Sequence, residues 1–357
     1  MCFACNLVFV SQPHILDAFI KLGHFLRKFC DNTESQSDVW ATRLNETIIK
    51  AGHINGWFTK ENIINALGAW GGQLTKEGLE NWLSNYSPLQ NGQSKTVAII
   101  MAGNIPLVGF HDFLAVLLTG NSVIAKLSSN DKILLPFVAQ FLIDSEPELS
   151  GKIRFTEDKL TDFDAVIATG SNNTSRYFDY YFGKYPNIIR KNRTSVAVLS
   201  GQETSEELKN LGKDIFQYYG LGCRSVSKLF VPKDYDFKLF FESIFDFQHI
   251  IDTHKYANNY DYNKAVFLMS EFKILDNNFL LLKEDTGHSS PIGTLYYEFY
   301  DDLDSLNKRL LDDALTLQCI ASNTEIADSI PLGTTQKPGL SDYADGVDTV
   351  EFLLGLQ

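Results

Sequence analysis

The chain alternates short apolar runs with stretches in which apolar residues recur at helical spacing. Residues 97–101 (VAIIM) and 123–125 (VIA) are two such runs, and residues 107–118 between them carry the helical pattern. Short runs that are apolar at every position are typical of strands buried on both faces, and the polar breaks around them mark turns. A strand, a helix and a strand within about thirty residues make one βαβ unit, so the two strands are expected to be parallel.

A third apolar run repeats this layout farther along the chain. Residues 163–168 (FDAVIA) predict a strand, residues 169–175 (TGSNNTS) predict a polar turn, and a helix is expected from Arg176 onward. Residues 196–199 (VAVL) predict another buried strand. Helical patterning dominates residues 13–85, which contain all four tryptophans. Core packing is the default interpretation of these rings, and a lid over a lipid-like acyl chain is the alternative.

Polar residues follow the predicted strands at their carboxyl ends, where ligands of parallel sheets bind. Asn104 comes after the first strand, and Lys126 directly follows the second. Gly170 and Ser171 lie in the turn after the third strand, where the N–H groups that open a helix suit a phosphate. A simple helix cap is the competing interpretation of that turn.

The block GLGCRSVSKLFVP, residues 220–232, contains the best candidate for a nucleophile, Cys223. A nucleophilic thiol needs access and a lowered pKa. Gly222 leaves space beside the sulfur, and Arg224 supplies positive charge that favours the thiolate. The alternative is a buried structural cysteine.

Together these segments resemble the aldehyde dehydrogenase superfamily, and most closely its acyl-CoA reductase branch, the LuxC type known from bacterial bioluminescence. The similarity extends from about Lys95 to the C-terminus. It rests on several ordered blocks, which are AGNIPLVGFHDF, GNSVIAKLSSND, ATGSNNTSRYF, GLGCRSVSKLFVP, SSPIGTLYYEFYDDLD and GLSDYADGVDTVEFLL. The resemblance implies an α/β, aldehyde-dehydrogenase-like fold with two Rossmann-like parallel-sheet domains and a helical N-terminal segment.

The resemblance also implies a role for each motif residue. Cys223 matches the nucleophile that accepts the acyl group, and Asn104 matches the amide that helps to form the oxyanion hole. Lys126 matches the lysine that reaches the adenosine ribose, and Gly170 and Ser171 match the turn under the pyrophosphate.

Three departures from the superfamily pattern bear on the reaction. Ser129 stands where NAD-preferring members often have a glutamate against the ribose, which favours NADPH over NADH. Residues 189–193 (IRKNR) replace the segment whose glutamate activates water in oxidising members, which argues against hydrolysis of the acyl group. Ser289 stands where many members place a glutamate against the nicotinamide ribose.

The resemblance therefore implies an acyl-CoA reductase that converts a long-chain fatty acyl thioester to an aldehyde with NADPH through a cysteine acyl-enzyme. Acyl-CoA or an acyl-enzyme is the expected donor, and an acyl-transferring protein partner and a homo-oligomer fit this interpretation. Two alternatives are open. One is a cysteine-dependent acyltransferase or thioesterase, and the other is a noncatalytic subunit of a fatty-acid-modifying complex.

Length and charge agree with a soluble enzyme of two domains. The 357 residues include 31 Lys and Arg against 44 Asp and Glu, and the resulting net charge of −13 argues against nonspecific nucleic-acid binding. We expect a cofactor-binding domain at 1–200, with its helical part at 13–90. A catalytic domain is expected at 201–331, followed by a C-terminal segment at 332–357 that returns to the cleft.

The remaining cysteines, histidines and basic residues predict less specific roles. The five cysteines have no framework spacing, which predicts reduced thiols and a cytoplasmic location, and the isolated C-x-x-C of Cys2 and Cys5 predicts no metal. No apolar run is long enough to span a membrane. A structural role is expected for His111, and His288 is a weak candidate proton donor. A local basic cluster is either a solvated turn or a phosphate contact, and comprises Lys184, Arg190, Lys191 and Arg193.

Overall fold

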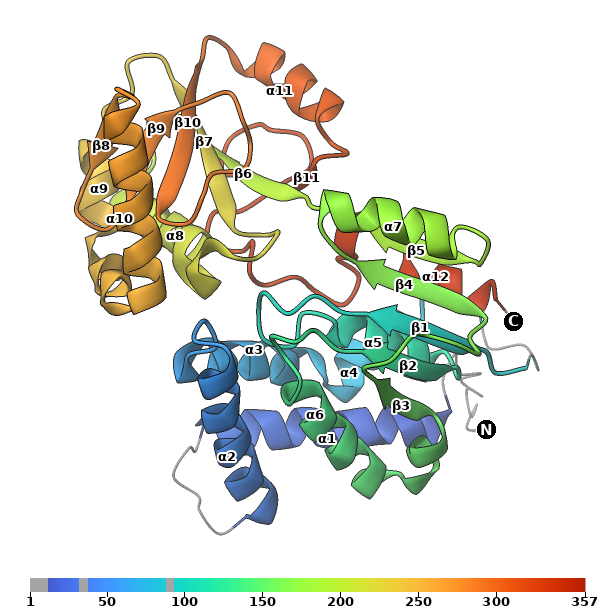
Figure 1. The fold of residues 1–357 in the computed structure, drawn as a ribbon. Helices are drawn as coiled ribbons and strands as arrows, with labels where there is room; N and C mark the ends of the chain where they lie inside the picture. Colours follow the sequence, from blue (N-terminus) through green and yellow to red (C-terminus); the bar gives the residue numbers. More distant parts are fainter. Residues whose placement is uncertain (1–11, 32–37, 88–92, 357) are drawn as a thin grey trace, which may run out of the picture. The chain divides into compact units, whose positions relative to one another are not determined.

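The computed structural model describes residues 12–31, 38–87 and 93–356, which fall into two compact units (Figure 1). The first unit comprises the described residues up to Lys191 together with those from Gly339 onward, and the second unit comprises residues 192–338. The C-x-x-C pair of Cys2 and Cys5 lies outside the described residues. No helix in the described ranges is both long enough and apolar enough to cross a membrane.

The first unit is built on a parallel sheet of five strands in the order β3-β2-β1-β4-β5. The strands are β1 (Thr96–Ile100), β2 (Ser122–Lys126), β3 (Ile153–Thr156), β4 (Ala165–Thr169) and β5 (Asn187–Arg190). The three apolar runs of the sequence form β1, β2 and β4, as predicted. The strand order reverses between β1 and β4, so the loops that follow these strands meet at the usual ligand-binding edge.

Four helices precede the sheet and account for the predicted helical segment. They are α1 (Pro13–Asp31), α2 (Val39–Ile54), α3 (Lys60–Gln73) and α4 (Lys76–Leu83). The last three begin at side-chain caps, in which Asp38, Thr59 and Thr75 accept a hydrogen bond from a first-turn N–H. Gly23 allows α1 to approach the end of α3, because a Cβ there would overlap the main chain of Leu74.

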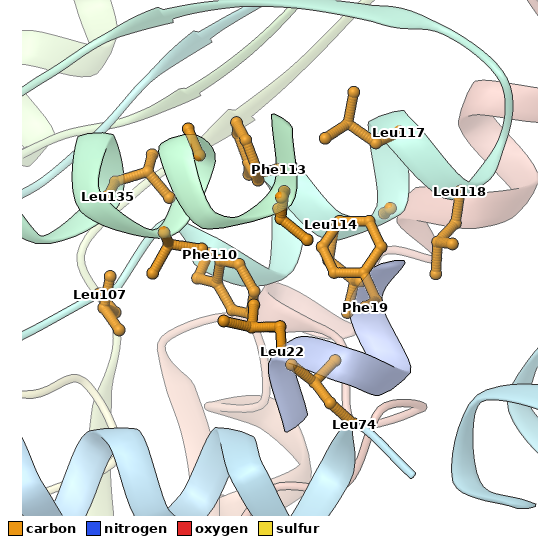
Figure 2. Close-up of a cluster of buried hydrophobic side chains, with 14 of the residues drawn as sticks. Phe19, Leu22, Leu74, Leu107, Phe110, Phe113, Leu114, Leu117, Leu118 and Leu135 are labelled. Carbon is orange, nitrogen blue, oxygen red and sulfur yellow. The ribbon is translucent and has the colours of Figure 1, made fainter. Parts of the chain in front are cut away.

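The core of the first unit is centred on α5 (Phe110–Leu118), which is buried on nearly every side (Figure 2). A helix that is apolar all round is stable only when other elements cover it. Figure 2 shows Phe19 and Leu22 of α1 beside Phe110 and Leu114 of α5. Further helices of this unit are α6 (Leu134–Ser145), η1 (Pro147–Gly151), α7 (Asn172–Phe182), η4 (Ala344–Gly346) and α12 (Thr349–Leu354).

The second unit is built on a seven-stranded sheet in the order β12-β11-β6-β7-β10-β9-β8, in which only the β8–β9 pair is antiparallel. The strands are β6 (Thr194–Val198), β7 (Val226–Pro232), β8 (Ile274–Asp276), β9 (Leu281–Glu284), β10 (Thr294–Tyr300), β11 (Leu317–Ser322) and β12 (Ser329–Ile330). The helices are α8 (Ser205–Phe216), η2 (Gln217–Gly220), α9 (Lys238–Ser243), η3 (Phe245–Asp252), α10 (His254–Met269) and α11 (Leu303–Asp312).

In the sequence, the second unit begins at residue 192 and ends at residue 338, whereas the expected boundaries were at 200 and 331. The apolar run at 196–199 forms most of β6, which pairs with β7 and β11 and so belongs to the second unit. The chain after Gly339 belongs to the first unit, because α12 packs on α5 and Trp82 Nε1 donates to Tyr343 Oη at 2.7 Å. The second unit is thus inserted between two parts of the first.

Candidate functional site

Asn104 lies in the loop that joins β1 to α5, at the carboxyl edge of the first unit's sheet. This loop turns through Leu107, whose φ of 56° lies in the left-handed region that leucine rarely adopts. The N–H of Leu107 donates to Asp131 Oδ2 at 3.3 Å, and Asp131 comes from the loop after β2. This hydrogen bond therefore joins the loop after β1 to the loop after β2, three positions after Asn104 in the sequence.

Glycine at position 103 allows the same two loops to touch on the other side of Asn104. A Cβ on Gly103 would lie 2.5 Å from Ser128 Oγ, which is closer than real Cβ contacts allow. The carbonyl of Gly103 also accepts a long hydrogen bond of 3.5 Å from Asn55 Nδ2, beyond the end of α2. Contacts on both sides of Asn104 thus hold its backbone.

Lys126 and Ser129 lie at the end of β2 and in the turn that follows it. Lys126 Nζ donates to the main-chain carbonyl of Asp158 at 2.9 Å, and Ser129 is exposed. Glu157, the acidic residue beside Asp158, forms an ion pair of 2.7 Å with Lys132. This end of β2 therefore offers the ammonium group of Lys126 and the hydroxyl group of Ser129. The carboxylate of the adjacent Glu157 is already paired with Lys132.

Gly170 and Ser171 lie between β4 and α7, but the helix begins earlier than expected. The sequence placed its start near Arg176, whereas α7 starts at Asn172 because Ser171 caps it, with its Oγ accepting from Thr174 N at 3.2 Å. A Cβ on Gly170 would lie 2.9 Å from a ring carbon of Phe178. Ser171 therefore performs the capping role of the competing interpretation, and its hydroxyl is oriented by that role.

The burial of Arg190 shows that this member of the basic cluster is neither in a solvated turn nor available for a phosphate contact. Its guanidinium group is buried and donates to Asp112 of α5 through Nη1 at 2.5 Å and Nη2 at 2.8 Å. Nη2 also donates to Thr349 Oγ1 at 3.0 Å. Neither motif spacing nor local composition could reveal this, because the partners are 78 and 159 positions away.

Cys223 lies in the second unit, in a turn between η2 and β7. Before it, Tyr218, Tyr219 and Gly220 all adopt left-handed conformations, with φ values of 55°, 59° and 73°. Non-glycine residues in this region store strain and cluster at functional sites. Cys223 itself is exposed, so the interpretation as a buried structural cysteine does not describe it.

The turn that carries Cys223 is anchored through its main chain. The carbonyl of Cys223 accepts a hydrogen bond of 2.9 Å from Ser195 Oγ on β6. Ser195 Oγ also lies 3.0 Å from Cys319 Sγ on β11. Ser195 was not singled out from the sequence, because an isolated serine next to the predicted strand at 196–199 carries no local signal of this contact.

The loop between β9 and β10 holds Ser289 and His288. Ser289 is exposed, and His288 Nε2 lies 3.0 Å from Asp313 Oδ2. Main-chain anchors fix the loop, since Ser227 Oγ donates to the His288 carbonyl at 2.6 Å and Lys228 Nζ donates to the Thr286 carbonyl at 3.0 Å. His288 therefore belongs to a carboxylate–imidazole pair in the second unit.

His111 has the structural environment that the sequence suggested. Burial lowers the pKa of its imidazole, and Nε2 lies 2.9 Å from the carbonyl oxygen of Leu340. Trp82 and Tyr343 have their rings within 5.4 Å of the imidazole centroid. This side chain links α5 to the C-terminal segment within the first unit.

Several solved structures of aldehyde dehydrogenases resemble the chain in fold at low sequence identity. An indole-3-acetaldehyde dehydrogenase in complex with NAD⁺ gives a TM-score of 0.62 at 13% identity, over 88% of this chain and 73% of that chain. A γ-glutamyl-γ-aminobutyraldehyde dehydrogenase from Burkholderia cenocepacia gives a TM-score of 0.61 at 14% identity, over 88% of this chain and 72% of that chain. An indole-3-acetaldehyde dehydrogenase from P. syringae gives a TM-score of 0.63 at 12% identity, over 92% of this chain and 75% of that chain.

The sequence match is more specific than the fold match. No curated protein matches the chain. The profile that describes the LuxC acyl-CoA reductases matches residues 32–240, a segment that contains Asn104 and Cys223 and spans more than half of the chain. The protein thus belongs to the LuxC family of acyl-CoA reductases.

Proposed function

We propose that this reductase converts a long-chain fatty acyl thioester, supplied as acyl-CoA or by an acyl-enzyme donor, to the aldehyde through an acyl-enzyme on Cys223. The observation that carries the proposal is the exposure of Cys223 on a turn whose main chain is anchored by Ser195. A covalent intermediate replaces one difficult step by two easier ones.

In the first step the Cys223 thiolate attacks the thioester carbonyl and forms a carbon–sulfur bond. The amide of Asn104 stabilises the oxyanion, a contribution that develops in the transition state. The carbon–sulfur bond to CoA then breaks, and CoA leaves as a thiol after it takes up a proton. When bound, NADPH would supply the hydride that reduces the acyl group to the thiohemiacetal. Collapse of the resulting thiohemiacetal breaks its bond to Cys223 and releases the aldehyde.

The segment at 189–193 supports reduction rather than hydrolysis of the acyl-enzyme. It contains no carboxylate that could activate water, and its Arg190 is committed to a buried ion pair with Asp112. Without a general base at this position, the acyl group is expected to persist until it is reduced.

We infer that Lys126, Ser129 and the Gly170–Ser171 turn hold the cofactor, and that NADPH is preferred over NADH. A 2′-phosphate at the end of β2 would meet an ammonium and a hydroxyl group, and the neighbouring Glu157 is neutralised by Lys132. The test is kcat/KM for both cofactors in the wild type and in Ser129→Glu. The variant should shift the ratio toward NADH, and a wild-type preference for NADH would contradict the assignment.

The acyl-enzyme is tested by mass spectrometry after the protein is mixed with palmitoyl-CoA in the absence of reductant. A thioester adduct is expected on the peptide that contains Cys223, and Cys223→Ser should lose both the adduct and aldehyde formation while still binding NADPH. Cys319→Ser is the matched control and should retain the adduct. Full activity in Cys223→Ser, or an adduct on Cys30 or Cys319 alone, would refute the proposal.

The same assay separates the reductase from the two alternatives. An acyltransferase or thioesterase would turn over the thioester without consuming NADPH, and a noncatalytic subunit would form no adduct. NADPH oxidation across saturated acyl-CoAs of increasing length then defines the preferred chain.

A further inference from the structure

The loop that contains Asn104 is held by a buried carboxylate from outside that loop. Asp131 belongs to the block GNSVIAKLSSND, but its side chain is not needed for the cofactor contacts proposed for Lys126 and Ser129. It is 9% exposed, and its two oxygens accept from different segments. Oδ2 accepts from Leu107 N and Oδ1 accepts from Leu134 N, both at 3.3 Å.

These two hydrogen bonds connect the segments that follow adjacent strands. Leu107 lies three positions after Asn104 in the loop after β1, and Leu134 begins α6 after β2. Leu107 has the left-handed φ of 56°, and its carbonyl accepts from Phe110 N at 3.0 Å at the start of α5. The carboxylate thus stabilises a conformation that a leucine adopts only when its surroundings enforce it.

The hydrogen bond from Leu134 N alone does not explain an aspartate at this buried position. Burial raises the pKa of the Asp131 carboxyl group, while the N–H groups of Leu107, Leu134 and Ile133 lower it. Serine or threonine could accept the hydrogen bond from Leu134 N without burying a charge. A carboxylate adds a second acceptor oxygen, and that oxygen is the one that reaches Leu107.

The packing around the loop explains why such an anchor is needed. Next to Leu107 lies a small pocket lined by Met101, Val108, Leu127 and Leu135. Apolar contacts around a pocket do not fix a backbone direction, whereas a hydrogen bond to the Leu107 N–H does. On the Gly103 side the loop accepts a long hydrogen bond of 3.5 Å from Asn55 and touches Ser128.

We propose that Asp131 is a positioning residue, which holds the loop at Leu107 so that the Asn104 amide is directed at the developing oxyanion. This inference rests on the proposed role of Asn104. Misplacement of a catalytic group by about 1 Å can cost about 10²-fold in rate.

The test is a double-mutant cycle of Asp131→Asn and Asn104→Ala, measured as kcat with palmitoyl-CoA and NADPH. Asn104→Ala should lower kcat by about 10²–10³-fold, the usual effect of losing one oxyanion donor. The amide introduced by Asp131→Asn has a single acceptor oxygen and cannot serve both Leu107 and Leu134. This variant should lower kcat by about 10–100-fold, with KM nearly unchanged. In the Asn104→Ala background the same substitution should have almost no further effect, because no amide is left to position.

Two further variants separate positioning from folding. Asp131→Ser keeps one acceptor oxygen near Leu134 but has none for Leu107, so it should lose kcat while thermal stability changes little. Asp164→Asn is the matched control, since its Oδ2 accepts from Thr96 N at 2.8 Å at the opposite edge of the same sheet. It should leave kcat unchanged.

The outcomes distinguish this inference from the function on which it rests. Wild-type kcat in Asn104→Ala would refute the oxyanion assignment itself. Suppose that Asn104→Ala lowers kcat but Asp131→Asn or Asp131→Ser does not, or that the double variant shows the product of the two single losses in kcat. The positioning role of Asp131 is then wrong, and the oxyanion assignment stands.

Discussion

Exposure distinguishes the three cysteines in the described part of the chain. Cys30 is half-buried on α1 with Sγ 3.7 Å from the carbonyl oxygen of Ile64, and burial raises the pKa of its thiol. Cys319 is half-buried against Ser195, whereas Cys223 is exposed. A long acyl chain carried as a thioester needs space at the sulfur, which only the exposed residue provides directly.

His111 should make stability depend on pH near neutrality. Its pKa is lowered in the folded protein, chiefly by burial, so below the unfolded value of about 6.5 the unfolded chain binds a proton that the folded protein excludes. The free energy of unfolding should therefore fall as the pH is lowered from 7 to 5, by at most about 1.4 kcal/mol per pH unit.

Urea denaturation at several pH values measures this dependence. His111→Gln can still donate to the Leu340 carbonyl and should flatten the curve in that range. His24→Gln on the exposed face of α1 is the control and should follow the wild type. An unchanged slope in His111→Gln would show that His111 titrates normally.

At the scale of secondary-structure elements, one buried ion pair joins three parts of the first unit. Arg190 ends β5, Asp112 lies in the first turn of α5, and Thr349 begins α12. Both charged side chains are no more than 7% exposed. Removal of one charged side chain leaves the other charge buried without its counter-ion.

Arg190→Met should therefore destabilise the protein by about 3–5 kcal/mol, the range for breaking a buried pair from one side. The double variant Arg190→Met with Asp112→Leu should recover much of the loss, because no unpaired charge remains. Lys132→Met, which breaks the exposed pair with Glu157, should change the melting temperature little. Equal losses in the single and double variants would contradict this account.

The start of α7 gives a second prediction at this scale. Gly170→Ala places a Cβ against Phe178 and Thr174, so the first turn of α7 must shift. If that turn holds the pyrophosphate, NADPH affinity measured by fluorescence titration should fall about tenfold, or about 1.4 kcal/mol. Gly151→Ala, with no atom within 4 Å of its added Cβ, is the control. Unchanged affinity in Gly170→Ala would remove the turn from the cofactor site.

The elements that could be predicted from sequence are those whose signal is local. Buried parallel strands are apolar at every position, which is why β1, β2 and β4 were found. The start of α7 was placed too late, because the cap at Ser171 was interpreted as part of the turn. The burial of Arg190 depends on residues far away in sequence, and the exposure of Cys223 depends on the conformation of the turn that carries it. Such tertiary contacts leave no periodic pattern.

At the scale of the whole molecule, the C-terminal segment completes the first unit. Val350 and Leu353 of α12 are fully buried, and Tyr86 Oη donates to Asp348 Oδ2 at 2.7 Å. Each fully buried side chain of this kind contributes about 1.5–3 kcal/mol. The second unit, in contrast, has its complete sheet within residues 192–338.

Removal of the chain after Pro338 should therefore destabilise the first unit selectively. Limited proteolysis with mass spectrometry should find new cleavage sites between residues 93 and 191, while residues 192–338 stay protected. Tyr343→Phe, which loses the hydroxyl contacts with Trp82 and Tyr86, should cost about 1–2 kcal/mol and leave both units resistant. Equal cleavage of both units in the truncated protein would refute this division of stability.

The insertion of the second unit into the first has a consequence for the order of folding during synthesis. Domains fold as units while the chain emerges from the ribosome. Residues 192–338 are all made before Gly339, so the unit that carries Cys223 can fold first. The unit that carries Asn104, Lys126 and the Gly170 turn must wait for α12. A nascent chain would thus hold a folded thiol-bearing unit before its proposed cofactor site exists.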